Sequence, residues 1–506
     1  MSEAAPRNLG RHVAAASLFM IGLRMSFRMI GVVSTLILVR LLAPTDFGIV
    51  GLAMAVASGL DLLTEASLGM ALIRLPEMTR AHLDTAFTFQ ILRGLLIGLV
   101  LVSTAGLAAS WMNEPRVGPI MWVLAATAVV QGFENIGMVE FRRNLQFSRI
   151  FEQRLYAKLF GMSVTMPIAA AFRSYWALVL GTVAIRVFVV AFSYYRHPFR
   201  PRLSLACWRE LFNFSKWFVL SNMMWVLDSY TATFLFSRIG GPRAVGLLQV
   251  SYQIASIPAS EIAAPIREPM YSGYARVLGD VARLRKQFVD GFSVLILVIG
   301  PMSAGIALTA DLVTPIALGP QWADAAPLIR LCAIYAFLDA IGHYPINLFV
   351  VLNRQRFFVL TFALIFSIRL PLLVWAGVSW GMEAGIMVLA ASGALGAFIW
   401  MRSAMPLVEL GLRELLVPVW RTLVSTGAMV VLLAVFADLH AGSAPFGALF
   451  VRMILIALCG AALQIGIQAA LWRLAGAPDG PETQLVSMAR QLLKRALATR
   501  LRAPAA

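Results

Sequence analysis

Two pairs of charged residues near the start of the chain could carry chemistry together. Arg24 and Arg28 are four residues apart, as are Asp61 and Glu65, so each pair lies on one face of its helix if the segment is helical. Guanidinium groups suit phosphate oxygens, which each of them can bind bidentately. Carboxylates can exchange a proton or a sodium ion, because burial raises the pKa of a carboxyl group and a neighbouring arginine lowers it.

All four residues lie in otherwise apolar segments, 13–41 and 47–73, and each segment exceeds the roughly 20 residues that a helix needs to cross a bilayer. A charge at the bilayer centre costs about 2.5–3.5 kcal/mol. We therefore expect the four side chains to face one another, or water, inside a helix bundle. This polar interior is the predicted place of function.

Further ionisable residues lie deep in later apolar segments, and the type of charge predicts the role. Arginine keeps its proton, so Arg24, Arg28 and Arg267 are candidates for a permanent anion-binding pocket. Arg93 and Arg186 lie nearer to span ends and are interpreted as snorkelling to the interface. The alternative for the deep residues is a set of structural ion pairs. The candidates for ion coupling, or for ion pairs within a cavity, are Asp61, Glu65, Asp228, Glu261 and Asp339.

The composition predicts an all-α integral membrane protein. The 506 residues are 60% hydrophobic and 13% charged, with a mean hydropathy of +0.80, whereas about 25% of residues are charged in a typical soluble domain. The apolar segments indicate about fourteen transmembrane helices. Their approximate bounds are 13–41, 47–73, 83–110, 117–139, 150–172, 174–195, 211–238, 244–275, 287–318, 325–352, 357–379, 382–404, 414–437 and 446–472.

The formal net charge of +17 is explained by membrane topology. Most of the 42 Lys and Arg residues lie in alternate connections and in the C-terminal tail, all on one side of the membrane. The positive-inside rule then places both termini in the cytoplasm. Because the excess charge follows the topology, it gives no reason to expect a nucleic-acid partner.

An internal repeat relates spans one and two to spans seven and eight. At an offset of 198 residues, two 22-residue segments share five residues, among them Pro44 with Pro242 and Gly48 with Gly246. Parallel repeats of this kind build transporters whose halves move about an axis along the membrane normal. We therefore expect two pseudo-symmetric six-helix lobes around a central cavity, followed by two further helices.

The predicted domain bounds follow from the repeat. They are 1–200 for the N-terminal lobe with spans one to six, 201–410 for the C-terminal lobe with spans seven to twelve, 411–475 for spans thirteen and fourteen, and 476–506 for a basic amphipathic tail on the cytoplasmic leaflet. Span eight contains Pro258, Pro265 and Pro269, and a broken helix at membrane depth usually lines a cavity.

No motif of an enzyme or a metal site accompanies these features. The chain has no P-loop, which argues against transport driven by ATP, and no G-x-S-x-G or H-E-x-x-H motif. The three cysteines, Cys207, Cys332 and Cys459, have no metal-binding spacing and are interpreted as apolar fillers. His343 is interpreted as a hydrogen-bonded bundle histidine in preference to a proton site. We expect no catalytic residue and no cofactor, and energy from a proton gradient, a sodium gradient or the substrate's own gradient.

Several segments resemble those of Wzx-type polysaccharide flippases, the lipid-linked oligosaccharide transporters of the MOP superfamily. They are LLAPTDFGIVGLAMAV with the later LGMALIR, SYWALVLG, FNFSKWFVLSNMM and ELLVPVW, in this order along the chain. The resemblance implies two six-span lobes around a cationic cavity that work by alternating access in the bacterial inner membrane. It implies movement of undecaprenyl-diphosphate-linked oligosaccharide units for export of O-antigen, capsule or exopolysaccharide. It also implies membrane lipid and a polysaccharide polymerase or export machinery as partners.

Under this resemblance, Arg24, Arg28 and Arg267 are expected to bind the diphosphate and the sugars. The closest alternative is a cation-coupled small-molecule antiporter of the same superfamily, which the buried arginines disfavour for cationic drugs. An integral-membrane glycan polymerase or ligase is a further alternative. Such enzymes typically need a sizeable periplasmic loop with catalytic residues, and the predicted loops on that side are very short.

Overall fold

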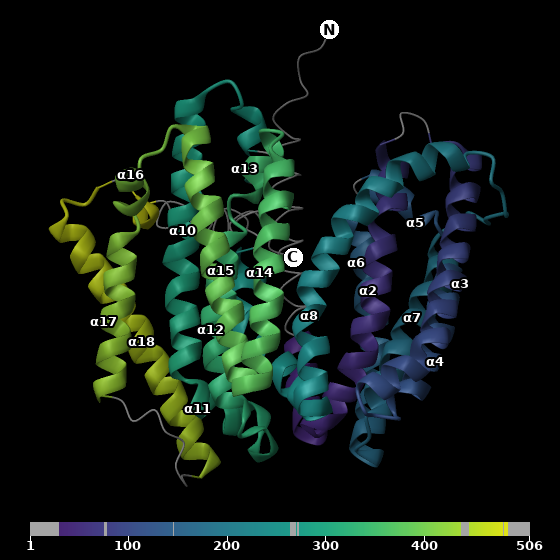
Figure 1. Cartoon of the computed structure of the whole chain (residues 1–506), viewed down its shortest axis with the longest axis horizontal. Helices are drawn as coiled ribbons and strands as arrows, with labels where there is room; N and C mark the ends of the chain where they lie inside the picture. The colour runs from purple at the N-terminus through teal and green to yellow at the C-terminus, as the bar shows by residue number, and fades with distance from the viewer. Residues whose placement is uncertain are drawn as a thin grey trace, which may run out of the picture. The chain divides into compact units, whose positions relative to one another are not determined.

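The computed structural model describes residues 30–74, 78–144, 146–263, 270, 273–436, 445–478 and 480–483. In these ranges the regular structure is helical and no strand occurs, as Figure 1 shows. The all-α prediction is therefore confirmed. A helical backbone satisfies its own hydrogen bonds, which is the condition for crossing a bilayer.

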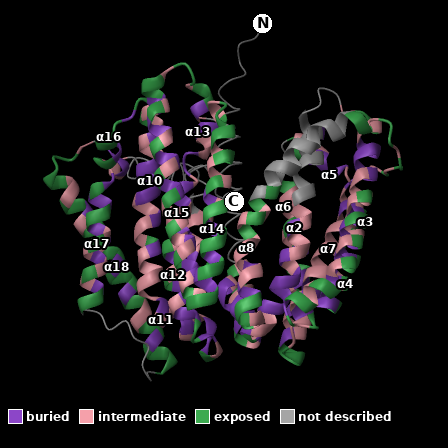
Figure 2. Ribbon diagram, viewed as in Figure 1, coloured by how far each residue is buried: buried purple, intermediate pink, exposed green. Residues whose placement is uncertain are grey.

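Nine helices among the described residues are long and apolar enough to cross a membrane. Three shorter apolar helices, Ile30–Leu41, Val117–Gly132 and Trp420–Val435, accompany them. Many large apolar side chains are exposed, among them Leu99, Leu107 and Phe398, and Figure 2 shows exposed residues recurring along the helices. This surface suits contact with lipid. The predicted number of fourteen spans stays a prediction.

Contacts divide the chain into two compact units, Met1–Gln249 and Val250–Ala506. The division follows packing density alone, so the lobe bounds drawn from the repeat at 200 and 201 stay a prediction. Residues 1–29 lie outside the described residues, and so does the part of the predicted tail (476–506) from residue 484 onward.

The first unit is built on two helix pairs and a helix that contacts both of them. In the first pair, α3 packs on α4 at close range, because an added Cβ at Gly94 would lie 2.7 Å from the carbonyl oxygen of Ala128. In the second pair, α6 packs on α7, and α2 contacts helices of both pairs. The helices are α2 (Pro44–Arg74), α3 (Arg80–Trp111), α4 (Val117–Gly132), α5 (Met138–Arg143), α6 (Phe147–Phe172), α7 (Trp176–Arg196) and α8 (Trp208–Ala255).

Helix α8 is broken at Gly241, whose φ is 64° and ψ is −163°. A positive φ suits glycine, and the next residue, Pro242, fits the start of a new helix. The predicted connection between spans seven and eight lies at this break.

The segment between α7 and α8 is held along one side of α3. The backbone N–H of Arg202 donates to Asp84 at 2.8 Å, and that of Ser204 donates to Thr88 Oγ1 at 2.8 Å. Asp84 and Thr88 are buried and four residues apart, so they face the same way on α3. The two side chains supply hydrogen-bond acceptors to a backbone that has no regular structure of its own there.

The connection between α3 and α4 carries an ion pair. Arg116 donates to the Glu114 carboxylate from Nε at 2.7 Å and from Nη2 at 2.9 Å. These hydrogen bonds are the main reason why the pKa of Glu114 lies below its ordinary value.

In the second unit, α12 packs against α15 and α10, and α15 also packs on α14. Phe288, Tyr344 and Trp400 belong to its main apolar core. The longer helices are α10 (Val281–Leu308), α12 (Ala325–Gly342), α14 (Gln355–Trp380), α15 (Met382–Ala404), α17 (Trp420–Phe436) and α18 (Phe446–Leu474). The shorter elements are η1 (Pro258–Ala263), α11 (Ala310–Val313), η2 (Thr314–Leu318), η3 (Pro320–Trp322), α13 (Ile346–Val351), η4 (Met405–Val408) and α16 (Leu412–Leu416).

A buried polar network joins α17 to α18. Arg421, only 2% exposed, donates from Nε and Nη2 to the carboxylate of Glu482 at 2.8 and 3.0 Å. Gln468 of α18 donates to the same carboxylate at 2.8 Å and accepts from Ser425 of α17 at 2.7 Å. The segment after α18 is thereby tied to both helices.

Candidate functional site

The structure describes only part of the predicted site. Arg24, Arg28 and Arg267, the predicted anion-binding residues, lie outside the described residues. Glu65 lies in α2, but its side chain is not described. The remaining four predicted residues are Asp61, Asp228, Glu261 and Asp339.

Asp61 of α2 forms the centre of an ion cluster in the first unit. Its Oδ1 accepts a hydrogen bond from Nη2 of Arg93 on α3 at 2.8 Å, and its Oδ2 lies 3.9 Å from Nη2 of Arg186 on α7. The side chains of Asp61 and Arg93 are only 18% and 15% exposed. The interpretation of Arg93 as a snorkelling residue is wrong, because its guanidinium is directed into the bundle and neutralises a carboxylate there. Arg186, 39% exposed, also lies near this carboxylate.

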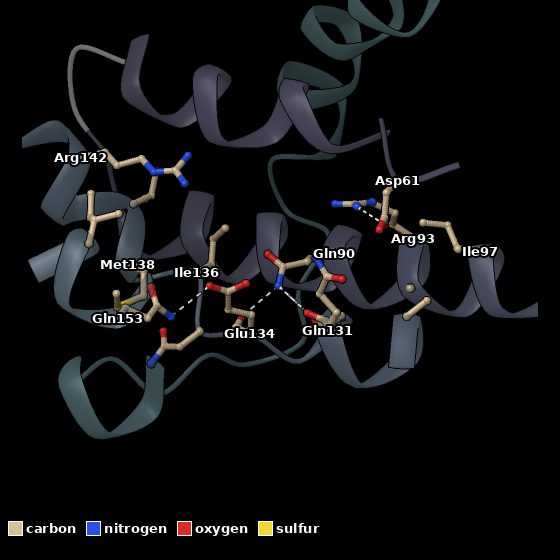
Figure 3. A pocket seen from close by; sticks show the side chains of 16 residues that line it. Asp61, Gln90, Arg93, Ile97, Gln131, Glu134, Ile136, Met138, Arg142 and Gln153 are labelled. Carbon is tan, nitrogen blue, oxygen red and sulfur yellow. Dashed lines mark hydrogen bonds and ion pairs between the residues drawn. The ribbon is translucent and has the colours of Figure 1, made fainter. Parts of the chain in front are cut away.

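The Asp61–Arg93 pair lines a partly open cavity of about 140 Å³, to which residues of α2 to α6 contribute. Glu134, which follows the end of α4, and Arg142 of α5 line the same cavity. In Figure 3 Arg142 lies at the opposite end of the cavity from the Asp61–Arg93 pair, with Glu134 between them. The cavity is thus lined by two carboxylates and two guanidinium groups, and Arg142, at one end of it, is exposed.

Neutral amide side chains complete the cavity. Gln90 donates from Nε2 to the backbone oxygens of Gln131, Gly132 and Glu134 at 3.3, 3.3 and 2.9 Å. Gln153 of α6, which is buried, donates to the Glu134 carboxylate at 3.4 Å and to the Val189 carbonyl at 3.1 Å. These hydrogen bonds fix the wall of the cavity and satisfy the carbonyl groups at the end of α4.

Such a cavity can hold water or a small cation. Carboxylate and amide oxygens are the ligands that hard cations prefer. The sequence predicts Asp61 as a deep charge, but Gln90, Gln131 and Gln153 were missed. The available signal was the occurrence of glutamines in apolar spans, where an uncharged polar group also needs a partner.

Two further predicted residues belong to the second unit. Glu261 lies in the π-helix η1 and accepts a hydrogen bond from Ser260 at 3.1 Å. Asp339 of α12 lies 3.2 Å from Nδ1 of His343, and the same nitrogen is 2.8 Å from the backbone oxygen of Asp339. These contacts agree with the interpretation of His343 as a hydrogen-bonded bundle histidine. A π-helical turn inside a membrane helix often marks a functional position.

The predicted residues are therefore not shown as one cluster. Asp61 and Asp228 belong to the first unit, whereas Glu261 and Asp339 belong to the second. Their convergence on a central cavity stays a prediction. Among the described residues, no group of three or more His, Cys, Asp or Glu side chains could hold a metal ion.

Comparison with known proteins gives a consistent picture. The family model described as "Polysaccharide biosynthesis protein" matches residues 37–327. The chain is 22% identical over 334 residues to the lipopolysaccharide biosynthesis protein WzxC of Escherichia coli (strain K12), covering 65% of this chain and 66% of WzxC. It is 21% identical over 302 residues to the succinoglycan biosynthesis transport protein ExoT of Rhizobium meliloti (strain 1021), covering 59% of this chain and 61% of ExoT. The chain thus spans slightly less than two thirds of each of these relatives.

Two solved structures share the fold. One is the lipid II flippase MurJ in an inward closed conformation, with a TM-score of 0.73 and 9% identity over 90% of this chain and 99% of MurJ. The other is a multidrug resistance MATE family transporter of the MOP superfamily in an inward-facing conformation, with a TM-score of 0.56 and 14% identity over 77% of this chain and 98% of that one. These likenesses confirm the predicted MOP-type fold, and the family match confirms the resemblance inferred from the sequence motifs.

Proposed function

Because the chain belongs to the polysaccharide biosynthesis protein family, we propose that it is a flippase for lipid-linked oligosaccharides. It moves a polyprenyl-diphosphate-linked unit across the bacterial inner membrane for surface polysaccharide export. It is a transporter, not an enzyme. The observation that carries the proposal is the match of residues 37–327 to that family model, in a bundle of membrane-length helices with the MOP-type fold.

The anionic diphosphate is the part of such a substrate that most needs a partner inside the membrane. Arg24, Arg28 and Arg267 supply it in this proposal, because a guanidinium binds phosphate oxygens through two parallel hydrogen bonds and stays charged at membrane depth. The sugars require a wet path for their hydroxyl groups. The polyprenyl tail stays in the surrounding lipid.

The cavity of the first unit is the proposed site of ion coupling. A proton or a sodium ion that reaches Asp61 competes with Arg93 for the same carboxylate oxygens, so ion binding weakens the 2.8 Å contact between α2 and α3. Glu134 offers a second carboxylate in the same cavity. Asp228, Glu261 and Asp339 remain candidates for the same role, as does Glu65.

The membrane orientation completes the proposal. The distribution of Lys and Arg supports cytoplasmic termini, since cytoplasmic loops carry the excess of positive charge. The substrate is then loaded from the cytoplasmic leaflet, where polyprenyl-linked units are assembled, and released to the opposite leaflet. A polymerase or an export complex is expected to receive the translocated lipid-linked unit.

Transport in proteoliposomes tests the proposal. The probe is a fluorescent undecaprenyl-diphosphate-linked oligosaccharide whose exposure on the outer leaflet is read by a membrane-impermeant quencher. We expect the wild-type protein to increase the rate of exposure, and Arg24→Ala together with Arg28→Ala to abolish the increase while the protein stays inserted. Arg473→Ala, which removes an exposed arginine at the end of α18, is the matched control and retains transport. Wild-type rates in the double variant would remove the diphosphate site.

The runner-up is the cation-coupled small-molecule antiporter considered from the sequence. Drug resistance conferred on a sensitive host, together with no movement of the lipid-linked probe, would favour it over the flippase.

A further inference from the structure

Polar side chains follow one side of the second part of α8 into η1. Tyr252, Ser256 and Ser260 are spaced four residues apart, and the backbone N–H of each later residue donates to the carbonyl of the earlier one at 2.8 Å. The three side chains therefore lie on one side of a continuous helical backbone. Gln253 beside them is exposed, and Ser260 donates to the carboxylate of Glu261 at 3.1 Å.

Helix α12 supplies a matching polar side. The ring of Tyr335 lies 5.8 Å from that of Tyr252, centroid to centroid, at an angle of 38° between the ring planes. Asp339 follows Tyr335 by four residues and so lies on the same face of α12. Since η1 also contacts α12, the two elements form one surface. We name this surface the polar strip, and its members are Tyr252, Gln253, Ser256, Glu261, Tyr335 and Asp339.

The fold does not require polar residues along this strip. At the repeat offset of 198 residues, Tyr252 corresponds to Met54 and Gln253 corresponds to Ala55. Met54 packs against an apolar core, and Ala55 is only 2% exposed. The repeat-equivalent positions of the first unit are thus apolar and packed, so the polarity in the second unit has a reason other than folding.

The strip borders water within the membrane span. Asp339 lies in the candidate span Ala325–Val351, and its side chain is 31% exposed. His343 covers one side of the carboxylate, with Nδ1 at 3.2 Å from Oδ1. A charged group at membrane depth faces the bundle interior or a water-filled path, because exposure to hydrocarbon is costly. Tyr252, 38% exposed, opens onto the same side.

The chemistry of the strip matches that of a sugar. A sugar ring has an apolar face of C–H groups and an edge of hydroxyl groups. The tyrosine pair offers aromatic rings with hydroxyl tips, and the amide of Gln253 both donates and accepts hydrogen bonds. Carboxylates accept hydroxyl protons in charge-assisted hydrogen bonds. The charged members of the strip, Glu261 and Asp339, are both acidic, so they repel a second carboxylate.

We propose that the polar strip binds the sugar of the lipid-linked substrate and selects uncharged sugars over sugars that carry a carboxylate. This inference rests on the proposed function, because it presumes a substrate with a sugar. It gives Asp339 and Glu261 a part in substrate selection that does not depend on an ion gradient. A site that hydrogen-bonds hydroxyl groups discriminates strongly, because its own polar groups stay unpaired with the wrong ligand.

Protection of a cysteine from alkylation tests the strip. The reporter is Ser256→Cys, a near-isosteric change, in a background in which Cys207, Cys332 and Cys459 are serine. The protein is placed in lipid nanodiscs and treated with a water-soluble maleimide. The probes are undecaprenyl diphosphate, the same carrier with glucose, and the same carrier with glucuronic acid, which differs from glucose by a carboxylate at C6.

We expect the maleimide to label the reporter when no probe is present. The glucose-linked carrier should slow labelling by about tenfold, as two or more hydrogen bonds would do, and the glucuronic-acid-linked carrier by about twofold at most. The carrier without sugar should have no effect. Absence of labelling would show that the strip is dry and would overturn the proposal. Equal protection by the three probes would overturn it as well.

Substitutions assign the protection to named side chains. Tyr335→Leu should abolish protection by the glucose-linked carrier, and Tyr335→Phe, which keeps the ring, should retain part of it. The matched control is Tyr195→Leu, which removes an 82% exposed tyrosine at the end of α7 and should change nothing. The comparison of the three probes on the reporter alone does not depend on the folding of these variants.

Asp339→Asn tests the selection against acidic sugars. It removes the charge and keeps the shape, so protection by the glucuronic-acid-linked carrier should rise to within about twofold of that by the glucose-linked carrier. A residue that acts only in ion coupling would leave this ratio unchanged, because nanodiscs hold no ion gradient. An unchanged ratio in Asp339→Asn and in the double variant Asp339→Asn, Glu261→Gln would overturn the selection.

The alkylation readout separates this inference from the proposed function. Sugar-dependent protection without movement of the lipid-linked probe in proteoliposomes counts against the flippase and supports the strip. Movement of the probe without sugar-dependent protection counts against the strip alone.

Discussion

Removal of the Asp61 charge should destabilise the first unit more than removal of the Arg93 charge. Asp61→Asn removes the carboxylate that both Arg93 and Arg186 approach, and loss of one partner of a largely buried pair costs about 3–5 kcal/mol. Arg93→Gln leaves Asp61 with Arg186, whose Nη2 is already 3.9 Å from the carboxylate. The remaining attraction offsets part of the loss, so we expect about 1–3 kcal/mol for this variant.

The double variant Asp61→Asn, Arg93→Gln removes both charges and should recover about 2–3 kcal/mol relative to the sum of the single variants, as expected for residues in direct contact. The measurement is the free energy of unfolding in bicelles by steric trapping. Additive single effects, or a larger loss for Arg93→Gln than for Asp61→Asn, would show that the ion cluster does not hold these helices together.

The same variants distinguish a structural ion pair from a coupling site. If the pair only stabilises the bundle, the double variant regains transport together with stability. If Asp61 exchanges the coupling ion, the double variant is stable and still lacks transport that depends on a proton or sodium gradient. We expect the second result.

Three further changes test other parts of the structure. Arg421→Met should cost about 3–5 kcal/mol because it leaves the largely buried Glu482 carboxylate without its guanidinium partner. The further change Glu482→Met should restore most of the lost apparent melting temperature. Thr88→Val removes the acceptor of the Ser204 N–H and should cost about 1–3 kcal/mol, with faster hydrogen exchange of the segment between α7 and α8. The pKa of Glu114 is lowered in the folded protein, so its ion pair stabilises the fold fully above the ordinary carboxyl pKa of 4.5. This stabilisation is lost as the pH falls from 4.5 through the lowered pKa. Glu114→Gln should therefore reduce the loss of apparent melting temperature on acidification, and an unchanged pH profile would contradict the pair.

The sequence predicted the helices and the main break because these follow from local chemistry. A long apolar segment in lipid has no alternative to a helix, and Gly241 followed by Pro242 ends one helix and begins another. The repeat identified equivalent positions from residue identity alone. It could not reveal that Gly48 lies against the carbonyl group of Pro242 and Gly246 against that of Pro44, because contact between distant segments depends on packing.

The partners of the charges were harder to predict for a physical reason. Hydropathy fixes the position of a residue along a membrane helix but not the rotation of that helix when all of its faces are apolar. Arg93 lies near enough to a span end for its long side chain to reach the interface, and only the packing of α3 against α2 directs it to Asp61. The glutamines of the cavity were missed because a search for charged residues in apolar segments does not pick out neutral amide side chains.

Helix α4 is only 16 residues long, fewer than the roughly 20 that a helix needs to cross the membrane unaided. Its last carbonyl groups accept hydrogen bonds from Gln90, a side chain of the preceding helix. An isolated α4 would expose those groups to hydrocarbon, where each unsatisfied group costs several kcal/mol. We therefore expect α3 and α4 to insert into the membrane together as a hairpin, because α3 carries the side chain that caps the end of α4.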